Sequence, residues 1–287
     1  MGAVYQRELK GYLHGMTGII FVCVNLLFSG LMLFLENLKY QDPKMESMIY
    51  YQLMILFLTV PILTMRSVAE ERRQKTDQLL YSLPISMPKI VLAKYFALLS
   101  TALLPTLVSL LYPLILAMYG TVNFGTTYTA LLTQALFVCL LCAIGMFISS
   151  MTESPAIAAI LTLTVNAALF LISFFTTAIP QTEIASLIGF AVIIVLLALL
   201  AFFMTKSVSV TYIVAALGVA AEVLVFFLKR DVFTGAINKV VEALSVFERV
   251  ELGTSGIMDL TGIVYFVTAA ALFVFLTVQA VEKRRWS

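Results

Sequence analysis

Charged side chains are scarce in this chain: they make up 12% of its 287 residues, whereas 61% of the residues are hydrophobic. A soluble domain carries roughly twice that share of charge. The net charge is only +2, and apolar runs separate the basic residues, which excludes the concentrated basic surface of a nucleic-acid-binding protein. The composition therefore predicts a chain that lives in a lipid bilayer and has no nucleic-acid partner.

Cysteine and histidine are also rare. Cys23, Cys139 and Cys142 all lie inside apolar runs, so they cannot form the disulfide framework of a small secreted domain. Cys139 and Cys142 form a CxxC pair, but no histidine or further cysteine lies nearby, and packing is the favoured interpretation over metal or redox chemistry. We interpret His14, the single histidine, as an interfacial residue. No metal site is predicted.

Two catalytic motifs are missing. A phosphate-binding P-loop needs Gly-Lys followed by Ser or Thr, and the chain contains no Gly-Lys pair. The sequence from Gly253 to Gly256 superficially resembles the serine motif of intramembrane proteases, but that chemistry needs a base near the serine, and His14 is expected on the opposite face. A turn accounts for both glycines. The chain is therefore predicted to be no enzyme, with no catalytic residue and no bound cofactor.

The feature that the chain does have is a series of long apolar runs. A helix that crosses the hydrocarbon core needs roughly 20 mainly apolar residues, because its backbone amides must be satisfied internally. The predicted fold is an all-α, polytopic transmembrane helix bundle that forms one domain over residues 1–287. Eight segments meet the length requirement, at residues 17–35, 48–65, 90–119, 128–151, 155–179, 184–204, 208–228 and 260–281. In the third, Pro105 and Pro113 are candidate kinks, and Lys94 places the first turn near the interface.

The distribution of Lys and Arg predicts the orientation, because these residues are retained on the cytoplasmic side. With the N-terminus inside, twelve of the 18 basic residues fall in the cytoplasmic pieces. This asymmetry predicts cytoplasmic N- and C-termini and an even number of spans. The spans at 184–204 and 208–228 form either a tight hairpin or a re-entrant pair, and both alternatives keep the parity.

Two segments depart from the pattern of span and short loop. In the 66–89 loop, Glu71 and Lys75, like Arg73 and Asp77, have the i,i+4 spacing of a helix that Pro84 would stop. This predicts a short charged helix with an apolar end. In the 229–259 segment, apolar residues recur every three or four positions and form a stripe: Phe233, Ile237, Val240, Val241, Leu244 and Phe247. The polar residues Asn238, Lys239, Glu242 and Glu248 lie off this stripe. An amphipathic helix in the outer interface and a helix that caps the bundle both fit this stripe.

The charged loop carries a family resemblance. The sequence RSVAEERRQKTDQLLYSLPIS, at 66–86, resembles the segment between the second and third helices of ABC-2 type transporter permeases, particularly the gliding-motility-type branch. The end of the chain, from Phe247 to Trp286, is similar to that family's last helix and its preceding outer segment, and YQRELKGYL at 5–13 fits its N-terminal interfacial helix, here 1–16. Compact members have six spans, so residues 184–228 are an added hairpin.

The resemblance implies the transport subunit of an exporter, which couples ATP hydrolysis in a separate subunit to substrate movement. Its partners would be a cytoplasmic ABC ATPase that holds ATP and Mg, a second permease copy in a homo- or heterodimer, and a membrane-anchored auxiliary subunit, all in the cell membrane. It places seven residues on the ATPase-coupling interface: Glu70, Glu71, Arg72, Arg73, Thr76, Leu79 and Leu80. It places Tyr5, Arg7, Glu8 and Tyr12 on the inner interfacial helix, with Tyr12 as an anchor.

Glu222 is the one acidic residue well inside an apolar run, and an ionisable group in a membrane is by default a functional candidate. The alternative, favoured here, is that it lies near the headgroups and pairs with Lys229 or Arg230. Two other function classes stay open: an ion-gradient-driven secondary transporter, expected to show several buried charges or broken helices, and a non-transporting receptor or structural subunit.

Overall fold

The computed structural model describes residues 1–40, 42–76, 85–178, 180–205, 216, 222, 233–257 and 260–285. The regular elements in these residues are helices, so the all-α prediction is confirmed for the described part of the chain. The chain divides into two compact units, one of residues 1–167 with 249–287 and one of residues 168–248. Most of the spans belong to the first unit.

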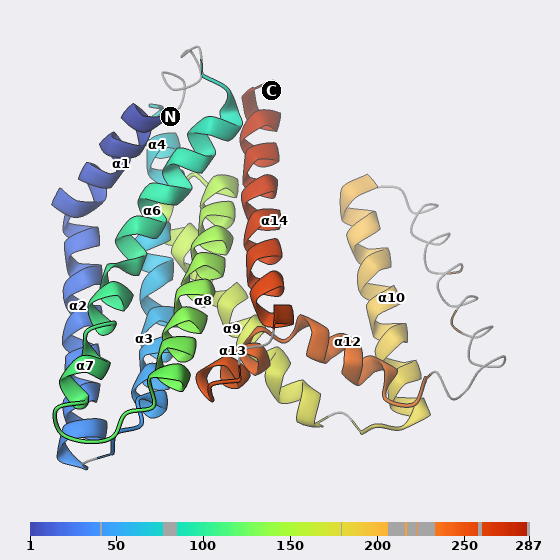
Figure 1. Ribbon diagram of the computed structural model, residues 1–287. Coiled ribbons are helices and arrows are strands. Elements are labelled where there is room, and N and C mark those ends of the chain that lie inside the picture. Colours follow the sequence, from blue (N-terminus) through green and yellow to red (C-terminus); the bar gives the residue numbers. More distant parts are fainter. Residues whose placement is uncertain are drawn as a thin grey trace. The chain divides into compact units, whose positions relative to one another are not determined.

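The first unit is a helix bundle (Figure 1). Its elements in chain order are α1 (Gly2–His14), α2 (Met16–Met32), the π-helix η1 (Leu33–Lys39), α3 (Glu46–Thr64), α4 (Ala69–Arg73), α6 (Met87–Ser109), α7 (Tyr112–Leu116), α8 (Phe124–Met151), the beginning of α9 (Pro155–Ala178), the end of α13 (Val246–Thr254) and α14 (Leu260–Arg285).

Six helical segments of the described chain are long and apolar enough to cross a membrane. They run over Met16–Lys39, Glu46–Arg73, Met87–Leu116, Phe124–Met151, Pro155–Ser173 and Leu260–Arg284. These match six of the eight predicted spans, and the chain is a multi-pass membrane protein by this measure. The sixth predicted span coincides with α10 (Glu183–Thr205), and the seventh lies outside the described residues except for Ala216 and Glu222.

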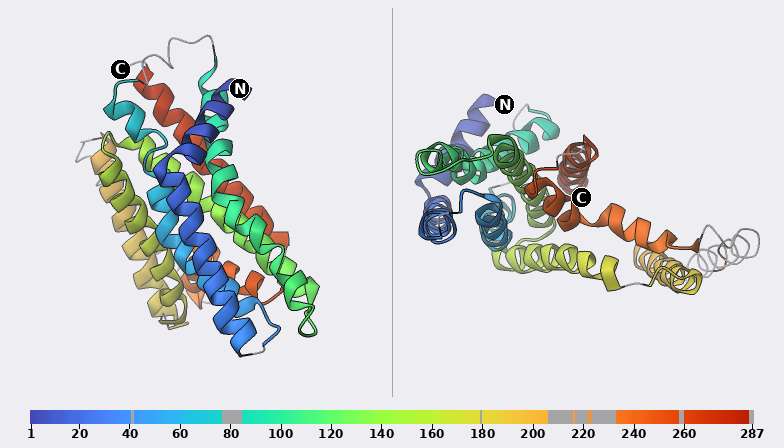
Figure 2. Two further views of the ribbon diagram at one scale, coloured as in Figure 1. Left: turned by 90° about the vertical axis from the view of Figure 1, so that its left-hand side faces the viewer. Right: turned by 60° about the horizontal axis from the view of Figure 1, so that its bottom comes forward.

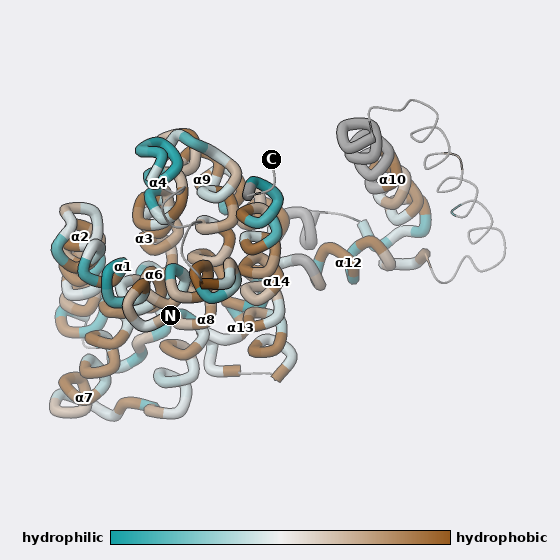
Figure 3. The backbone as a smooth tube through the Cα atoms, turned by 90° about the horizontal axis from the view of Figure 1, so that it is seen from above, coloured by the Kyte–Doolittle hydropathy of each residue, from teal (hydrophilic) through white to brown (hydrophobic). Residues whose placement is uncertain are grey.

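Both chain termini lie at the same end of the first unit, here named the polar end (Figures 1 and 2). It comprises α1, α4, the beginning of α6 and the end of α14, and the view down this end shows hydrophilic residues on α1, α4 and α14 (Figure 3). An ion pair between Arg284 of α14 and Glu153, which follows α8, also lies here. Most of the basic residues expected to be cytoplasmic are therefore gathered at one end.

Helix α8 is the core of the first unit. In the most apolar 18-residue stretch of α8, 72% of the residues are buried, a larger share than in the corresponding stretch of the other five spans. It packs against α14, α3 and α6. Gly145 is required where α3 approaches, because a Cβ atom there would lie 2.2 Å from Oγ1 of Thr64. Close packing of small residues is how membrane helices associate, since lipid gives them no hydrophobic drive.

The third span is broken near the end that lies away from the polar end. Pro105 lies inside α6 without ending it, but α6 stops at Ser109 and α7 begins at Tyr112. Proline lacks an N–H donor and fits the first turn of a helix, so Pro113 favours a new start there. The predicted interruption at Pro113 is present, and the one at Pro105 leaves the helix continuous.

The second unit contains the end of α9, α10 and α12 (Ala236–Leu244). The predicted stripe at 229–259 forms two helices, because Ser245 takes an extended conformation between α12 and α13. Ile237 and Phe233 are buried, as the stripe predicts, and Ile237 packs against Gly189 of α10. Asn238 is buried as well, contrary to its predicted place off the stripe.

Candidate functional site

The short helix α4, the described part of the predicted charged helix, is attached to the end of α8. The first N–H groups of any helix lack partners within it. Here the backbone N–H groups of Val68 and Ala69 donate to Oγ of Ser149, at 3.2 and 3.0 Å, and that hydroxyl donates to the carbonyl of Met65 at 3.0 Å. One buried serine of α8 therefore joins the end of the second span to the beginning of α4.

The other end of α4 is closed by a Schellman motif. The N–H of Thr76 donates to the carbonyl of Glu71, and the N–H of Lys75 donates to the carbonyl of Arg72, each at 3.0 Å. Lys75 takes the left-handed conformation that the motif needs, with φ 54°. The helix thus ends at Arg73, before the expected leucine pair, and residues 77–84, with Leu79 and Leu80, lie outside the described residues.

Lys75 gives the first testable prediction. A residue with a Cβ atom loses about 1 kcal/mol or more in the left-handed region, whereas glycine does not. We expect Lys75→Gly to slow hydrogen exchange of the amides of Lys75 and Thr76 about fivefold. The control is Lys75→Ala, which removes the charge but keeps the strain and should leave exchange unchanged. Equal protection in both variants would show that the charge, and not the backbone, is what matters.

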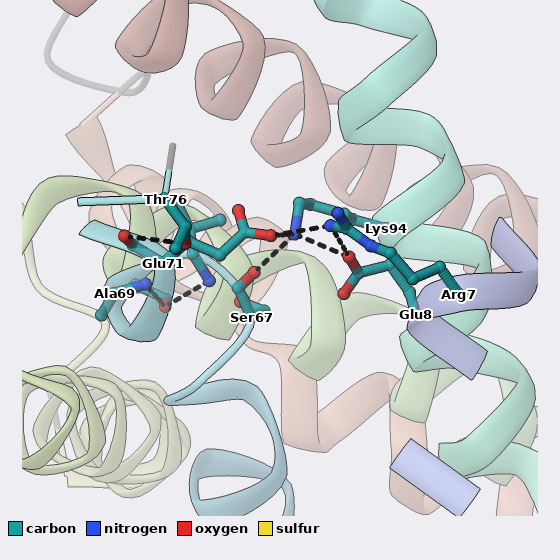
Figure 4. A network of polar contacts seen from close by, with 9 residues as sticks. Arg7, Glu8, Ser67, Ala69, Glu71, Thr76 and Lys94 are labelled. Atoms are coloured by element: carbon teal, nitrogen blue, oxygen red, sulfur yellow. Dashed lines mark hydrogen bonds and ion pairs between the residues drawn. The ribbon is translucent and has the colours of Figure 1, made fainter. Parts of the chain in front are cut away.

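Four charged side chains from three helices meet beside α4, and we name them the α4 node: Arg7 and Glu8 of α1, Glu71 of α4 and Lys94 of α6 (Figure 4). Nζ of Lys94 lies 2.7 Å from Oε1 of Glu71 and 3.2 Å from Oε1 of Glu8. Its third donor reaches the carbonyl of Ser67 at 3.2 Å. Arg7 bonds the same two carboxylates, at 2.6 Å to Glu8 and 3.0 Å to Glu71.

The α4 node is electrically balanced, with two cations and two carboxylates. The Lys94 side chain is only 6% exposed, so it needs both anionic partners to offset its lost hydration. Burial raises the pKa of the Glu8 carboxyl, but the charge of Lys94 and the charge and hydrogen bond of Arg7 outweigh it, and the pKa lies below its usual value. Glu8 is therefore ionised at neutral pH, which keeps α1 tied to α4 and α6.

Helix α1 packs along α6 at the polar end. The hydroxyls of Tyr5 and Ser100 share a hydrogen bond of 3.0 Å. Tyr12, predicted as an anchor in the headgroup region, is buried, and this burial raises the pKa of its phenol. His14 is exposed, and its Nδ1 lies 3.1 Å from the carbonyl of Lys10. All four residues predicted on this helix thus hold α1 against the bundle: Tyr5 bonds Ser100, Arg7 and Glu8 belong to the α4 node, and Tyr12 is buried.

The predicted coupling residues divide between two sides of α4. Glu71 does not pair with Lys75 but points into the α4 node, and Arg72 is buried with 6% exposure. Glu70 and Arg73 form an exposed i,i+3 ion pair of 2.7 Å, and Gln74 donates to the same carboxylate. Glu70, Arg73 and the exposed Thr76 are therefore the described coupling residues that a partner can reach.

Buried amides inside the first unit were missed by sequence reasoning, which considered only charged groups within spans. Nδ2 of Asn25 donates to Thr59 at 3.1 Å, and Nε2 of Gln52 donates to Oδ1 of Asn25 at 3.3 Å. Nε2 of Gln134 donates to Thr106 at 3.2 Å. All three amide side chains are fully buried. Their positions inside long apolar runs were the available signal, because polar groups in a membrane are rare and are kept for a reason.

The remaining candidates offer no catalytic arrangement. Glu222 is 9% exposed, and its proposed partners Lys229 and Arg230 lie outside the described residues. Cys139 and Cys142 are free thiols. Gly256, with φ 84°, forms the predicted turn before α14. In the described part of the chain, no three His, Cys, Asp or Glu side chains gather as metal ligands would.

Comparison with known proteins adds no relative. The chain matches no family model, no curated protein and no solved structure.

Proposed function

We propose that this chain is the permease subunit of an ABC-2 type ATP-driven exporter in the cell membrane. The observation that carries the proposal is the way α4 is attached to the helix bundle. This short helix presents Glu70 and Arg73 outward, while Ser149 and Lys94 fix its other side to α8 and α6. A helix built in this way can receive a push from a partner and pass it to the spans.

The partner would be a cytoplasmic ATPase, since the chain has no P-loop of its own. ATP and Mg would be bound there, and two ATPases would serve a pair of permeases, either two copies of this chain or this chain and a similar one. In this view closure of the ATPases moves α4, and the α4 node moves α1 and α6 with it as rigid bodies. The basic polar end would then face the cytoplasm. An auxiliary membrane-anchored subunit is a further expected partner.

Buried charge separates this function from a gradient-driven transporter, which needs ionisable groups near the middle of the membrane. Among the described residues, the charged side chains that are buried are Arg72, Lys94 and Glu222. The first two belong to the polar end, Arg72 on α4 itself and Lys94 in the α4 node. Glu222 alone gives little support to an ion path.

Copurification tests the proposal. The tagged chain, extracted in mild detergent, should bring down ATP-hydrolysing activity from its own membranes. Glu70→Arg and Arg73→Glu each break the exposed pair and present the wrong charge, so we expect the recovered activity to fall about tenfold in each. The double variant that exchanges the two residues keeps the pair but reverses its direction, and it should recover part of the activity.

Lys239→Glu is the matched control, because Lys239 is an exposed charge on α12 in the second unit. It should leave the recovered activity unchanged. Absence of ATP hydrolysis in the wild-type preparation, or equal losses in the control, would contradict the proposal and favour a receptor or structural subunit.

A further inference from the structure

A pocket of about 540 Å³ lies between η1 and the chain around the end of α7. Leu38 and Pro43 line it from the first of these segments, and Leu116, Tyr119 and Gly120 line it from the second. Helix α7 packs against η1 at the end of the first unit that lies away from the polar end (Figure 1). The π-helix is a rare form that occurs frequently at functional sites. Small-molecule sites usually measure about 300–1,000 Å³, so this pocket can hold a small organic ligand.

Asn37 of η1 also lines this pocket, and it carries an unused hydrogen-bond acceptor. The residue is 2% exposed, and its Nδ2 donates to the carbonyls of Asp42 at 2.8 Å and Lys44 at 2.7 Å. Two carbonyl partners identify this end of the amide as the nitrogen, so Oδ1 is the acceptor. Oδ1 is buried and has no hydrogen-bond partner among the described residues. Such a group is costly unless a donor reaches it, and it therefore indicates a donor that a ligand supplies.

Asp42 gives the pocket its charge. The residue is exposed, and its Oδ1 accepts from the backbone N–H of Lys44 at 2.9 Å, which fixes the position of the carboxylate. Lys44 does not line the pocket, and Asp42 forms no ion pair within the described chain. The backbone N–H groups of Tyr119 and Gly120 both donate to the carbonyl of Leu116, at 2.9 and 3.0 Å, so they are not free to bind an anion. The polar part of the lining therefore favours a cation that can donate hydrogen bonds.

A metal ion suits this pocket poorly. Hard cations such as calcium take about six to eight oxygen ligands, most of them from carboxylates and carbonyls. Asp42 is the one carboxylate in the described lining, and no three His, Cys, Asp or Glu side chains gather as metal ligands in the described part of the chain. Much of the lining is instead apolar, with Leu38, Pro43 and Leu116 together with the exposed ring of Tyr119. A cation with an apolar body fits both parts of the lining.

From these observations we propose that the pocket binds a small organic cation, a primary ammonium group on an apolar body. The ammonium donates to the carboxylate of Asp42 and to Oδ1 of Asn37, whose amide already bonds the backbone of Asp42 and so lies close to it. An ammonium group has three donors, enough for both acceptors. The apolar body lies against Leu38 and Leu116. The proposal concerns the first unit alone and does not rest on an ATPase partner.

Isothermal titration calorimetry of the purified chain in detergent, with phenethylamine and its neutral isostere phenethyl alcohol, tests this site. Titrations into detergent alone supply the baseline. The amine should bind about tenfold more tightly than the alcohol, because its charged group donates to a carboxylate. Asp42→Asn keeps the shape of the side chain and removes its charge, so it should abolish this preference. Gly120→Leu should weaken binding of both probes, since a Cβ there meets Pro43 at an ordinary contact of 3.8 Å and the longer side chain occupies the pocket.

Two matched controls lie outside the pocket lining. Glu46→Gln removes a negative charge at the beginning of α3, and Gly262→Leu adds the same side chain at a position of α14 where a Cβ meets open space. Both should bind the two probes as the wild type does, and thermal unfolding shows whether each variant is folded. Equal affinity of the wild type for the two probes would overturn the preference for a cation, and unchanged binding in Gly120→Leu would overturn the pocket as the site. Calcium binding that Asp42→Asn abolishes, without binding of the amine, would identify a metal site instead.

Discussion

Lys94→Met should destabilise the chain by about 3 kcal/mol and release α1 from the bundle. Methionine matches the length of the lysine stem but leaves the carboxylates of Glu8 and Glu71 without their shared cation. Removing one member of a buried ion pair costs about 3–5 kcal/mol, and we take the lower value because Arg7 still contacts both carboxylates. Thermal unfolding in detergent, with proteolysis at α1, measures the change.

Two variants make this prediction specific. Lys89→Met removes an exposed lysine from the same helix and should have little effect. Adding Glu8→Gln to Lys94→Met removes one of the opposed carboxylates and should restore part of the stability. If the double variant is as unstable as the sum of the two single variants, Lys94 and Glu8 do not interact.

Ser149→Ala should cost about 2 kcal/mol and loosen α4. The hydroxyl accepts from the N–H groups of Val68 and Ala69 and donates to Met65, and alanine leaves these backbone groups buried without it. A buried polar group that loses its partner costs about 1–3 kcal/mol. Hydrogen exchange of residues 68–72 should rise together with the loss of thermal stability.

The neighbouring serine is the control. Ser150 is also buried, but its Oγ donates only within its own helix, to the carbonyl of Phe147. Ser150→Ala should therefore change neither α4 exchange nor thermal stability by more than about 0.5 kcal/mol. Comparable effects of the two substitutions would show that the end of α8, and not the bond to α4, decides the result.

The spans were predictable because lipid imposes a strict rule: only long apolar helices satisfy their backbone in the hydrocarbon core. The local charge pattern also located α4. It did not predict the partners of those charges, because i,i+4 spacing concerns only one helix. Glu71 bonds Lys94, 23 positions away, and Arg7, 64 positions away. Such pairs depend on how α1, α4 and α6 meet in space.

Ser149 could not be recognised as an anchor from sequence, because a serine near the end of an apolar run has many possible roles. Its role appears only once the loop after α3 is placed against α8. The stripe at 229–259 shows the opposite case. Periodicity predicted its buried face at Phe233, Ile237 and Phe247, but the extended Ser245 divides it into two helices, and this break carries no Gly or Pro signal.

The most direct test of the central claim is site-specific crosslinking from α4 in native membranes. A photoreactive residue at the exposed Thr76 should form an adduct with a nucleotide-binding protein, and its yield should change when ATP is added. The same residue at the exposed Tyr119, which follows α7 at the opposite end of the first unit, should form no such adduct. An adduct with a nucleotide-binding protein from Tyr119, or none from Thr76, would contradict α4 as the coupling helix.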